Sequence, residues 1–120
     1  MRDDEKSLAN TERRLRNWGA VYRGSGVPGY ATPSYDQPDV SVTRDELDAA
    51  DVEEVIVLLK TSPRAHRRYM YRVAWVRYIE DLPNQVAADA VKRSESQYRI
   101  DVGKLLAWVD GALESWRKVS

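Results

Sequence analysis

Apolar residues recur along much of this chain at intervals of three and four positions, the spacing that places side chains on one face of an α-helix. The longest such series follows Ser94 and comprises Tyr98, Val102, Leu105, Leu106, Val109, Leu113 and Trp116. A shorter series comprises Val52, Val55, Ile56 and Leu59. No segment alternates as a half-buried strand does, so the pattern predicts an all-α fold, a small helical domain spanning residues 1–120.

A first helix is expected within residues 1–23. Leu8, Leu15, Trp18 and Tyr22 can share one stripe of it, and Asn10 or Thr11 could serve as its N-cap. Residues 24–41 then bring together glycines and prolines without any periodicity, which predicts a long irregular loop. We expect this loop either to be mobile or to be held against the helices by Tyr30 and Tyr35.

A helical hairpin is predicted for residues 42–82. Its first helix begins at the capping-box pattern Thr43-Arg-Asp-Glu46, and its second runs from Pro63 to Ile79 with Ser62 as N-cap. The second helix should bury a stripe formed by Ala65, Tyr69, Val73 and Val76. The opposite face would carry Arg64, Arg67, Arg68, Tyr71, Trp75 and Tyr78. This face suits a nucleic acid or a protein partner, but it equally suits a filled space between helices in which arginine stems cover aromatic rings.

Residues 83–120 have the spacing of a helix-turn-helix. A short helix over Gln85–Val91 is followed by the turn Lys92-Arg93-Ser94 and by a long helix that Ser94 can cap. Ala88 stands where two such helices cross, while Val91 and Tyr98 occupy the inward apolar positions. Lys92 stands where glycine is common and Arg93 where an apolar residue is common. A plain helical hairpin fits the same spacing, so both interpretations stay open.

If the motif binds DNA, residues from the turn and from the outer side of the long helix would contact it. Ser96, Gln97, Ile100 and Lys104 project from that side. Gln97 could form two hydrogen bonds to an adenine edge, and Ile100 could contact a thymine methyl group. Lys92, Arg93 and Arg99 are candidates for phosphate contacts that position the protein without reading sequence. A solvated polar face is the alternative.

Small residues recur every four positions on the long helix, at Gly103, Ala107 and Gly111. This spacing lets another backbone approach closely. Packing within the chain is the favoured use, and self-association is the alternative.

Charge and composition narrow the choice of partner and chemistry. The chain has 19 Lys/Arg and 19 Asp/Glu, but residues 61–120 hold 11 basic and 7 acidic residues, so the C-terminal half is the better candidate for a polyanion. The absence of cysteine and a single histidine, His66, exclude disulfides and the usual zinc sites. No catalytic constellation is evident, so we expect neither an enzyme nor a cofactor. With no apolar N-terminal stretch and no run of about 20 apolar residues, neither a signal peptide nor a membrane span is expected, which indicates a cytoplasmic protein.

Several segments together resemble bacteriophage late-gene antiterminators of the Q type and related phage late-transcription regulators whose C-terminal region is like sigma-factor region 4. These segments are residues 14–23, residues 48–55, residues 86–100 and residues 106–113. The absence of cysteine departs from the zinc-containing members of that group and leaves the zinc-free ones.

The resemblance implies a protein that binds a double-stranded DNA element near a late promoter and makes host RNA polymerase, with its sigma factor, resistant to terminators. It places Lys92, Arg93, Ser96, Gln97 and Arg99 at the DNA and implies a bacterial host cytoplasm. Two alternatives remain: a simple helix-turn-helix activator or repressor, and a DNA-packaging subunit of the small-terminase kind that assembles into a ring.

Overall fold

The structure is a computed structural model that describes residues 2–28 and 43–119. Five α-helices and one π-helical turn follow one another in the described residues: α1 (Arg2–Ser25), α2 (Arg44–Lys60), α3 (Ala65–Ala74), η1 (Trp75–Ile79), α4 (Asn84–Ala90) and α5 (Glu95–Val119). These residues contain no strand, and the predicted all-α fold is confirmed for them. Tyr30 and Tyr35 lie outside the described residues, as does most of the expected loop.

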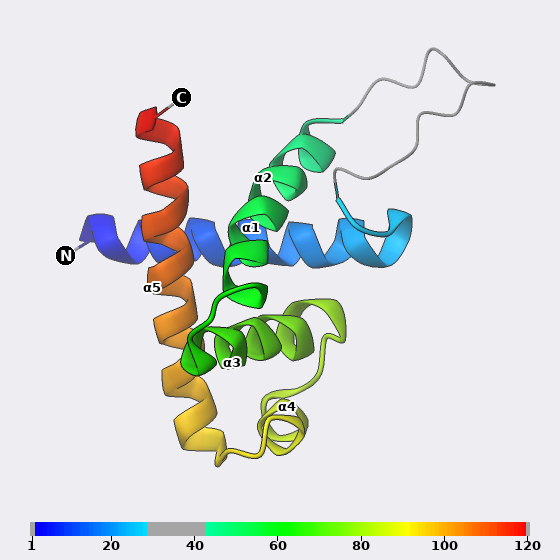
Figure 1. Ribbon diagram of the computed structural model, residues 1–120, viewed down its shortest axis with the longest axis vertical. Coiled ribbons are helices and arrows are strands. Elements are labelled where there is room, and N and C mark those ends of the chain that lie inside the picture. Colours follow the sequence, from blue (N-terminus) through cyan, green and yellow to red (C-terminus); the bar gives the residue numbers. More distant parts are fainter. Residues whose placement is uncertain (1, 29–42, 120) are drawn as a thin grey trace.

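The two longest helices, α1 and α5, cross each other, and the shorter helices pack around the crossing (Figure 1). Helix α2 lies across α1, α3 begins beside α5 beneath the end of α2 and runs away from α5, and short α4 lies beside the first turns of α5. Because α5 contacts α1, α2, α3 and α4, it connects the whole assembly.

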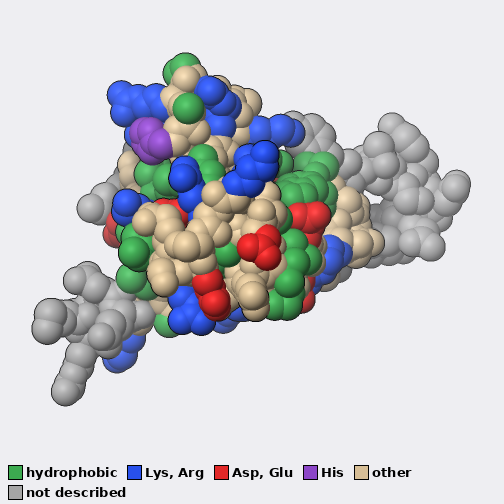
Figure 2. Space-filling model, turned by 90° about the horizontal axis from the view of Figure 1, so that it is seen from below, with side chains coloured by type: hydrophobic (Ala, Val, Ile, Leu, Met, Phe, Trp, Pro, Cys, Tyr) green, Lys and Arg blue, Asp and Glu red, His purple; other side chains and the backbone are tan. Residues whose placement is uncertain are grey.

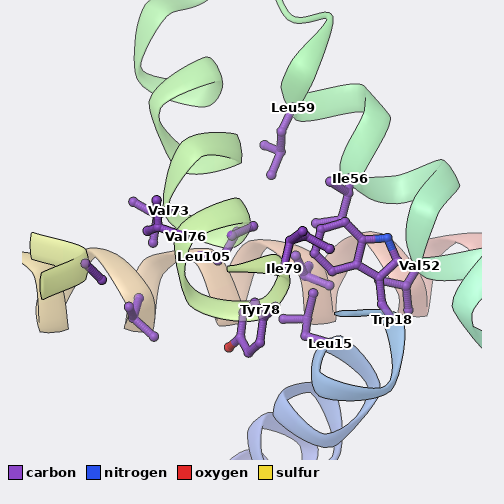
Figure 3. Packing of buried hydrophobic residues seen from close by; sticks show 14 of the residues in the cluster. Leu15, Trp18, Val52, Ile56, Leu59, Val73, Val76, Tyr78, Ile79 and Leu105 are labelled. Atoms are coloured by element: carbon purple, nitrogen blue, oxygen red, sulfur yellow. The ribbon is translucent and has the colours of Figure 1, made fainter. Parts of the chain in front are cut away.

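The core forms where these helices converge (Figure 3). Leu15 and Trp18 from α1 and Ile56 and Leu59 from α2 are completely buried, as is Leu105 from α5. Val55, Val102, Val109 and Leu113 from the predicted stripes are also buried, whereas Leu106 is only partly buried. The side chain of Trp116 lies outside the described part of α5. In the described residues both apolar series therefore face the core as predicted, with Leu106 only partly buried.

Helix α1 begins well before the expected caps. Thr11 is an interior helical residue that is 2% exposed, so its assignment as an N-cap was wrong. Its hydroxyl instead donates to Asp110 Oδ1 on α5 over 2.9 Å, and Ser7 Oγ donates to the same oxygen over 2.5 Å. Gly24 and Ser25, assigned to the loop, complete the last turn of α1, and Gly26 ends it with a φ of +83°. The buried hydroxyl of Thr11 therefore links α1 to α5 and does not cap a helix.

The start of α2 follows the capping pattern. Thr43 has an extended backbone, and its hydroxyl oxygen accepts a hydrogen bond from the Glu46 amide over 3.1 Å. Two further contacts fix α2 on α1. Arg14 Nε lies 2.7 Å from Asp48 Oδ1, and Trp18 Nε1 donates to Glu53 Oε1 over 3.0 Å.

The start of α3 differs from the expectation. Arg64, not Ser62, is the N-cap residue, and the Ser62 hydroxyl accepts a hydrogen bond from the Arg64 amide over 3.1 Å. The connection therefore extends through Pro63 and Arg64 before the helix begins. Ala65, assigned to the buried stripe, is exposed, because the first turn of α3 lies at the edge of the assembly.

The predicted single helix from Pro63 to Ile79 ends instead in the π-helical turn η1, which changes the direction of its last side chains. The Glu80 amide donates to the carbonyl of Trp75, five residues earlier, over 3.0 Å. This wider turn accommodates one extra residue, which delays the following side chains by roughly 100°. Tyr78, expected on the outer face, is consequently only 2% exposed, and that assignment was wrong.

A polar network surrounds Tyr78 within this part of the core. Its hydroxyl donates to Glu12 on α1, and Arg77 Nη2 lies 3.0 Å from the same carboxylate. Arg77 Nη1 also donates to Asn84 Oδ1 over 3.1 Å. Burial, together with the hydrogen bond to Glu12, raises the pKa of Tyr78. The network ties α1 to η1 and to the first residue of α4.

Candidate nucleic-acid interface

Helix α4 and helix α5 are joined by the four residues 91–94, and the geometry of this connection is well defined. The Arg93 amide donates to the Ala88 carbonyl over 2.9 Å and the Lys92 amide to the Asp89 carbonyl over 3.1 Å, the paired bonds of a Schellman motif. This motif requires a left-handed residue, usually glycine, after the helix, and Lys92 supplies it with a φ of +60°. The Ser94 hydroxyl then accepts from the Gln97 amide over 3.1 Å, which confirms its role as N-cap of α5.

Ala88, expected where the two helices cross, and the two residues expected at inward apolar positions, Val91 and Tyr98, are buried. Ala88 is 1% exposed, Val91 3% and Tyr98 0%. Because Ala88 has a small side chain, α4 can approach α5 closely, and Val91 and Tyr98 fill the angle between them. The predicted burial of these three residues is confirmed, and the helix-turn-helix stays a prediction.

The turn and the first turns of α5 present a continuous exposed surface. All seven candidate DNA-contacting residues are exposed: Lys92, Arg93, Ser96, Gln97, Arg99, Ile100 and Lys104. Ile100 exposes 54% of its surface on this side. Glu95 is the only exposed acid between residues 91 and 104, and it pairs with Arg99 over 2.9 Å. The surface therefore carries no unpaired exposed carboxylate that would repel a polyanion.

Gln97 differs from the other candidates because its side chain already has a partner. Its Nε2 atom donates to Asp101 Oδ1 over 2.9 Å, and the Tyr69 hydroxyl donates to Asp101 Oδ2 over 2.5 Å. Asp101 itself is 7% exposed. Burial and the hydrogen bond to Asp101 raise the pKa of Tyr69 to about 12, so this hydroxyl stays protonated near neutral pH. The interaction joins α3 to α5.

A hollow of about 350 Å³ opens beside these residues, between α3 and the start of α5. It is lined by His66, Tyr69, Met70, Arg93, Gln97, Asp101 and Lys104. The Arg93 guanidinium lies over the Tyr69 ring at 4.9 Å from its centroid. In Figure 2, Lys and Arg side chains in blue gather around the single histidine, which is purple. Tyr69 was expected in the buried stripe of its helix, and no role at a site was predicted for His66 or Asp101.

The arginine and aromatic residues expected on the outer face of the helix from Pro63 to Ile79, now divided between α3 and η1, do not form one surface. Trp75 packs edge-on against Tyr22 of α1 with centroids 5.2 Å apart, and Tyr71 lies 6.1 Å from Trp75. These two rings fill space between helices. At the other end of α3, Arg67 stacks on Trp108, and Arg68 donates to the Ser62 carbonyl over 2.8 Å. Arg64 is exposed at the start of the helix.

The small residues of α5 do not serve packing within the described chain. Gly103, Ala107 and Gly111 are all exposed, and a Cβ added at Gly103 or Gly111 would have no neighbour within 4 Å. The favoured interpretation of this spacing was therefore wrong, because the apolar stripe of α5 turns these positions outward. Self-association through them stays a prediction.

Among the described residues, no group of three or more His, Asp or Glu side chains could hold a metal ion. No described helix is both long and apolar enough to cross a membrane. Comparisons of the chain with protein-family models, with curated proteins and with solved structures find no match.

Proposed function

We propose that this protein is a sequence-specific DNA-binding transcription regulator that uses α4, the connection 91–94 and α5 as a helix-turn-helix. The observation that carries the proposal is the exposed surface of the turn and the first turns of α5, which is basic or neutral apart from the paired Glu95. A helix that enters the major groove needs such a surface, since the phosphates on both sides are negative. The buried contacts of Ala88, Val91 and Tyr98 support the proposal because they hold the two helices at a fixed angle.

The positions of the side chains suggest a division of roles. Ser96 and Ile100 lie near the centre of the outward face of α5, where base edges would be reached. Gln97 lies at the border of this face and must exchange its hydrogen bond to Asp101 if it contacts a base. Lys92 and Arg93, in the turn, would hold the DNA backbone.

A finer proposal is that the regulator acts in transcription antitermination. The segments that resemble Q-type antiterminators fall in α1, α2, α4 and α5. In that role the protein would bind DNA near a promoter and also hold RNA polymerase. The simple activator or repressor and the packaging subunit are the other outcomes that experiments would distinguish.

The DNA-binding proposal is tested by measuring affinity for duplex DNA at several salt concentrations. Three to five phosphate contacts would give a log–log slope of about −3 to −5 per subunit, because each contact releases condensed counterions. Affinity that stays constant between low and moderate salt would contradict the proposal.

Sequence reading is tested after a preferred site has been selected from random duplexes. Ile100→Ala and Gln97→Ala should each reduce the preference for this site over a scrambled one, by about 1–3 kcal/mol where a bidentate or well-packed base contact is lost. Arg93→Ala should weaken both complexes alike. Asn10→Ala, which changes an exposed amide on α1, is the matched control. Unchanged preference in both α5 variants would mean that this helix does not read the bases.

A further inference from the structure

The hollow between α3 and α5 combines groups from three parts of the chain that the fold brings together. Arg93 comes from the turn, Lys104 from the third turn of α5 and His66 from the first turn of α3. Neither Arg93 nor Lys104 forms a salt bridge with any described residue. Two cationic groups of this kind, directed at a concave surface, suit a small anion with several acceptor oxygens.

Asp101 is the one carboxylate in the lining, and its hydrogen bonds limit its effect on an anion. Both carboxylate oxygens already accept hydrogen bonds, one from Gln97 and one from the Tyr69 hydroxyl. The remaining lining groups that carry charge are cationic, so the hollow keeps an excess of positive charge even when His66 is neutral. Asp101 thereby fixes Tyr69, and the Tyr69 ring in turn supports the Arg93 guanidinium.

We propose that this hollow is a phosphate-binding site in which Arg93 and Lys104 hold a single phosphate group and His66 borders it. The site rests in part on the proposed function, because its position beside the exposed face of α5 suits a backbone phosphate of bound DNA. The same chemistry would also accept the phosphate of a free small molecule. In the structure without DNA, the hydrogen bond from Gln97 to Asp101 helps to keep Asp101 and Tyr69 in place.

The first arm of the test uses DNA and the double variant Arg93→Gln/Lys104→Gln. If both side chains hold one phosphate, the log–log salt slope of duplex binding should become shallower by about 0.9, the contribution of one contact. A change of about 1.8 would assign them to two separate phosphates and overturn a shared site. Arg13→Gln on α1 together with Lys6→Gln is the control with the same change in charge, and its slope should stay unchanged.

The second arm uses inorganic phosphate and the imidazole NMR signal of His66, which is the only histidine in the chain. Phosphate added at constant ionic strength should shift this signal saturably in the parent and in the control variant, and the shift should disappear in Lys104→Gln. Lys104 makes no hydrogen bond or salt bridge with a described residue, so Lys104→Gln should leave the fold and the hydrogen bonds of the hollow intact. Loss of the shift in this variant would therefore report lost phosphate binding and not unfolding.

The two arms distinguish the sources of the phosphate and separate this proposal from the proposed function. Saturable phosphate binding with an unchanged DNA slope in the double variant assigns the site to a free phosphorylated ligand. A parent protein that binds no DNA but shows saturable phosphate binding contradicts the proposed function and keeps the site. Normal DNA binding with neither a slope change nor a phosphate-dependent shift overturns the site and keeps the proposed function.

Discussion

At the scale of single residues, Gly19 shows why one position in α1 cannot carry a side chain. A Cβ there would lie 2.1 Å from the backbone carbonyl oxygen of Tyr78 in η1. Because backbone cannot move aside cheaply, we expect Gly19→Ala to lower the free energy of unfolding by about 1–3 kcal/mol or more. Gly111→Ala on α5, where the added methyl group meets open space, should raise it by about 0.5–1 kcal/mol through the better helix propensity of alanine.

Urea denaturation of both variants measures these differences. Equal and small effects at the two positions would mean that α1 does not contact η1 as closely as described. The two variants are expected to change the free energy of unfolding in opposite directions, whatever the function of the protein.

The ionisation of the partly buried Glu53 makes the stability of the fold depend on pH. Burial raises the pKa of Glu53 above its ordinary value of 4.5, although the hydrogen bond from Trp18 partly opposes this shift. The folded state therefore binds the proton more tightly than the unfolded state, and the contribution of Glu53 to stability falls as the pH rises past 4.5 toward the folded pKa. Glu53→Gln keeps an acceptor for the Trp18 indole without the charge, so it should raise Tm at pH 7.

Thermal melting between pH 4 and pH 8 checks this prediction. The gain in Tm should shrink toward acid pH, where the parent carboxyl is also neutral. The control is Glu54→Gln, an exposed neighbour on the same helix, which should show no such pH dependence. A gain that is equal for the two variants would contradict the assigned role of burial.

At the scale of elements, the connection between α4 and α5 is stable despite an unfavourable residue at its left-handed position. Lys92 has a φ of +60°, a conformation that costs a non-glycine residue about 1 kcal/mol. We expect Lys92→Gly to stabilise the fold by about this amount and, if Lys92 holds a phosphate, to weaken DNA binding at the same time. Asp81→Gly, with a φ of +53° in another connection, should stabilise the fold without weakening DNA binding.

Chemical denaturation and salt-dependent DNA titration measure the two properties separately. Stabilisation of Lys92→Gly without any loss of DNA affinity would remove Lys92 from the interface. Loss of stability would instead mean that the lysine side chain makes a contact that offsets the backbone strain.

The elements also show what sequence alone can and cannot predict. The stripes of α2 and α5 were predictable because uninterrupted helical periodicity fixes which side is buried. The burial of Tyr78 was not predictable. The π-helical turn at 75–79 shifts the helical periodicity, and no residue type in the sequence signals such a turn. In the candidate site, the cap at Ser94 and the exposure of the seven residues followed from local spacing. The hollow did not, because it requires Tyr69 and Asp101, 32 positions apart, to meet.

At the scale of the whole molecule, the surface proposed to bind DNA occupies only one end of the assembly. The exposed residues of the turn and of early α5 lie with α4 at one end, while α1 crosses the middle and α2 and the later turns of α5 extend away from that end (Figure 1). A protein that only blocked or activated a promoter would need this end and little else. The remaining helices therefore leave room for the second macromolecule that the antitermination proposal requires.

Transcription with purified RNA polymerase and a terminator downstream of the binding site tests that proposal. We expect the protein to increase read-through of the terminator without changing initiation. Charge reversal of Arg67 or Arg68 would disturb packing, because Arg67 stacks on Trp108 and Arg68 donates to the Ser62 carbonyl. Arg64→Glu is the cleaner variant because Arg64 is exposed and begins α3 through its backbone.

Arg64→Glu should abolish read-through and leave most of the DNA affinity, because its guanidinium stands at the start of α3 and outside the lining of the hollow. Arg13→Glu on α1, with the same change of charge at another exposed site, should preserve both activities. A parallel loss of DNA binding and read-through in Arg64→Glu would make this residue part of the DNA surface. If the parent protein changes initiation only, the simple regulator replaces the antiterminator. If the parent protein elutes as a large ring, the packaging subunit replaces the antiterminator. A ring needs an interface between copies, whereas a regulator that acts on one polymerase does not need one.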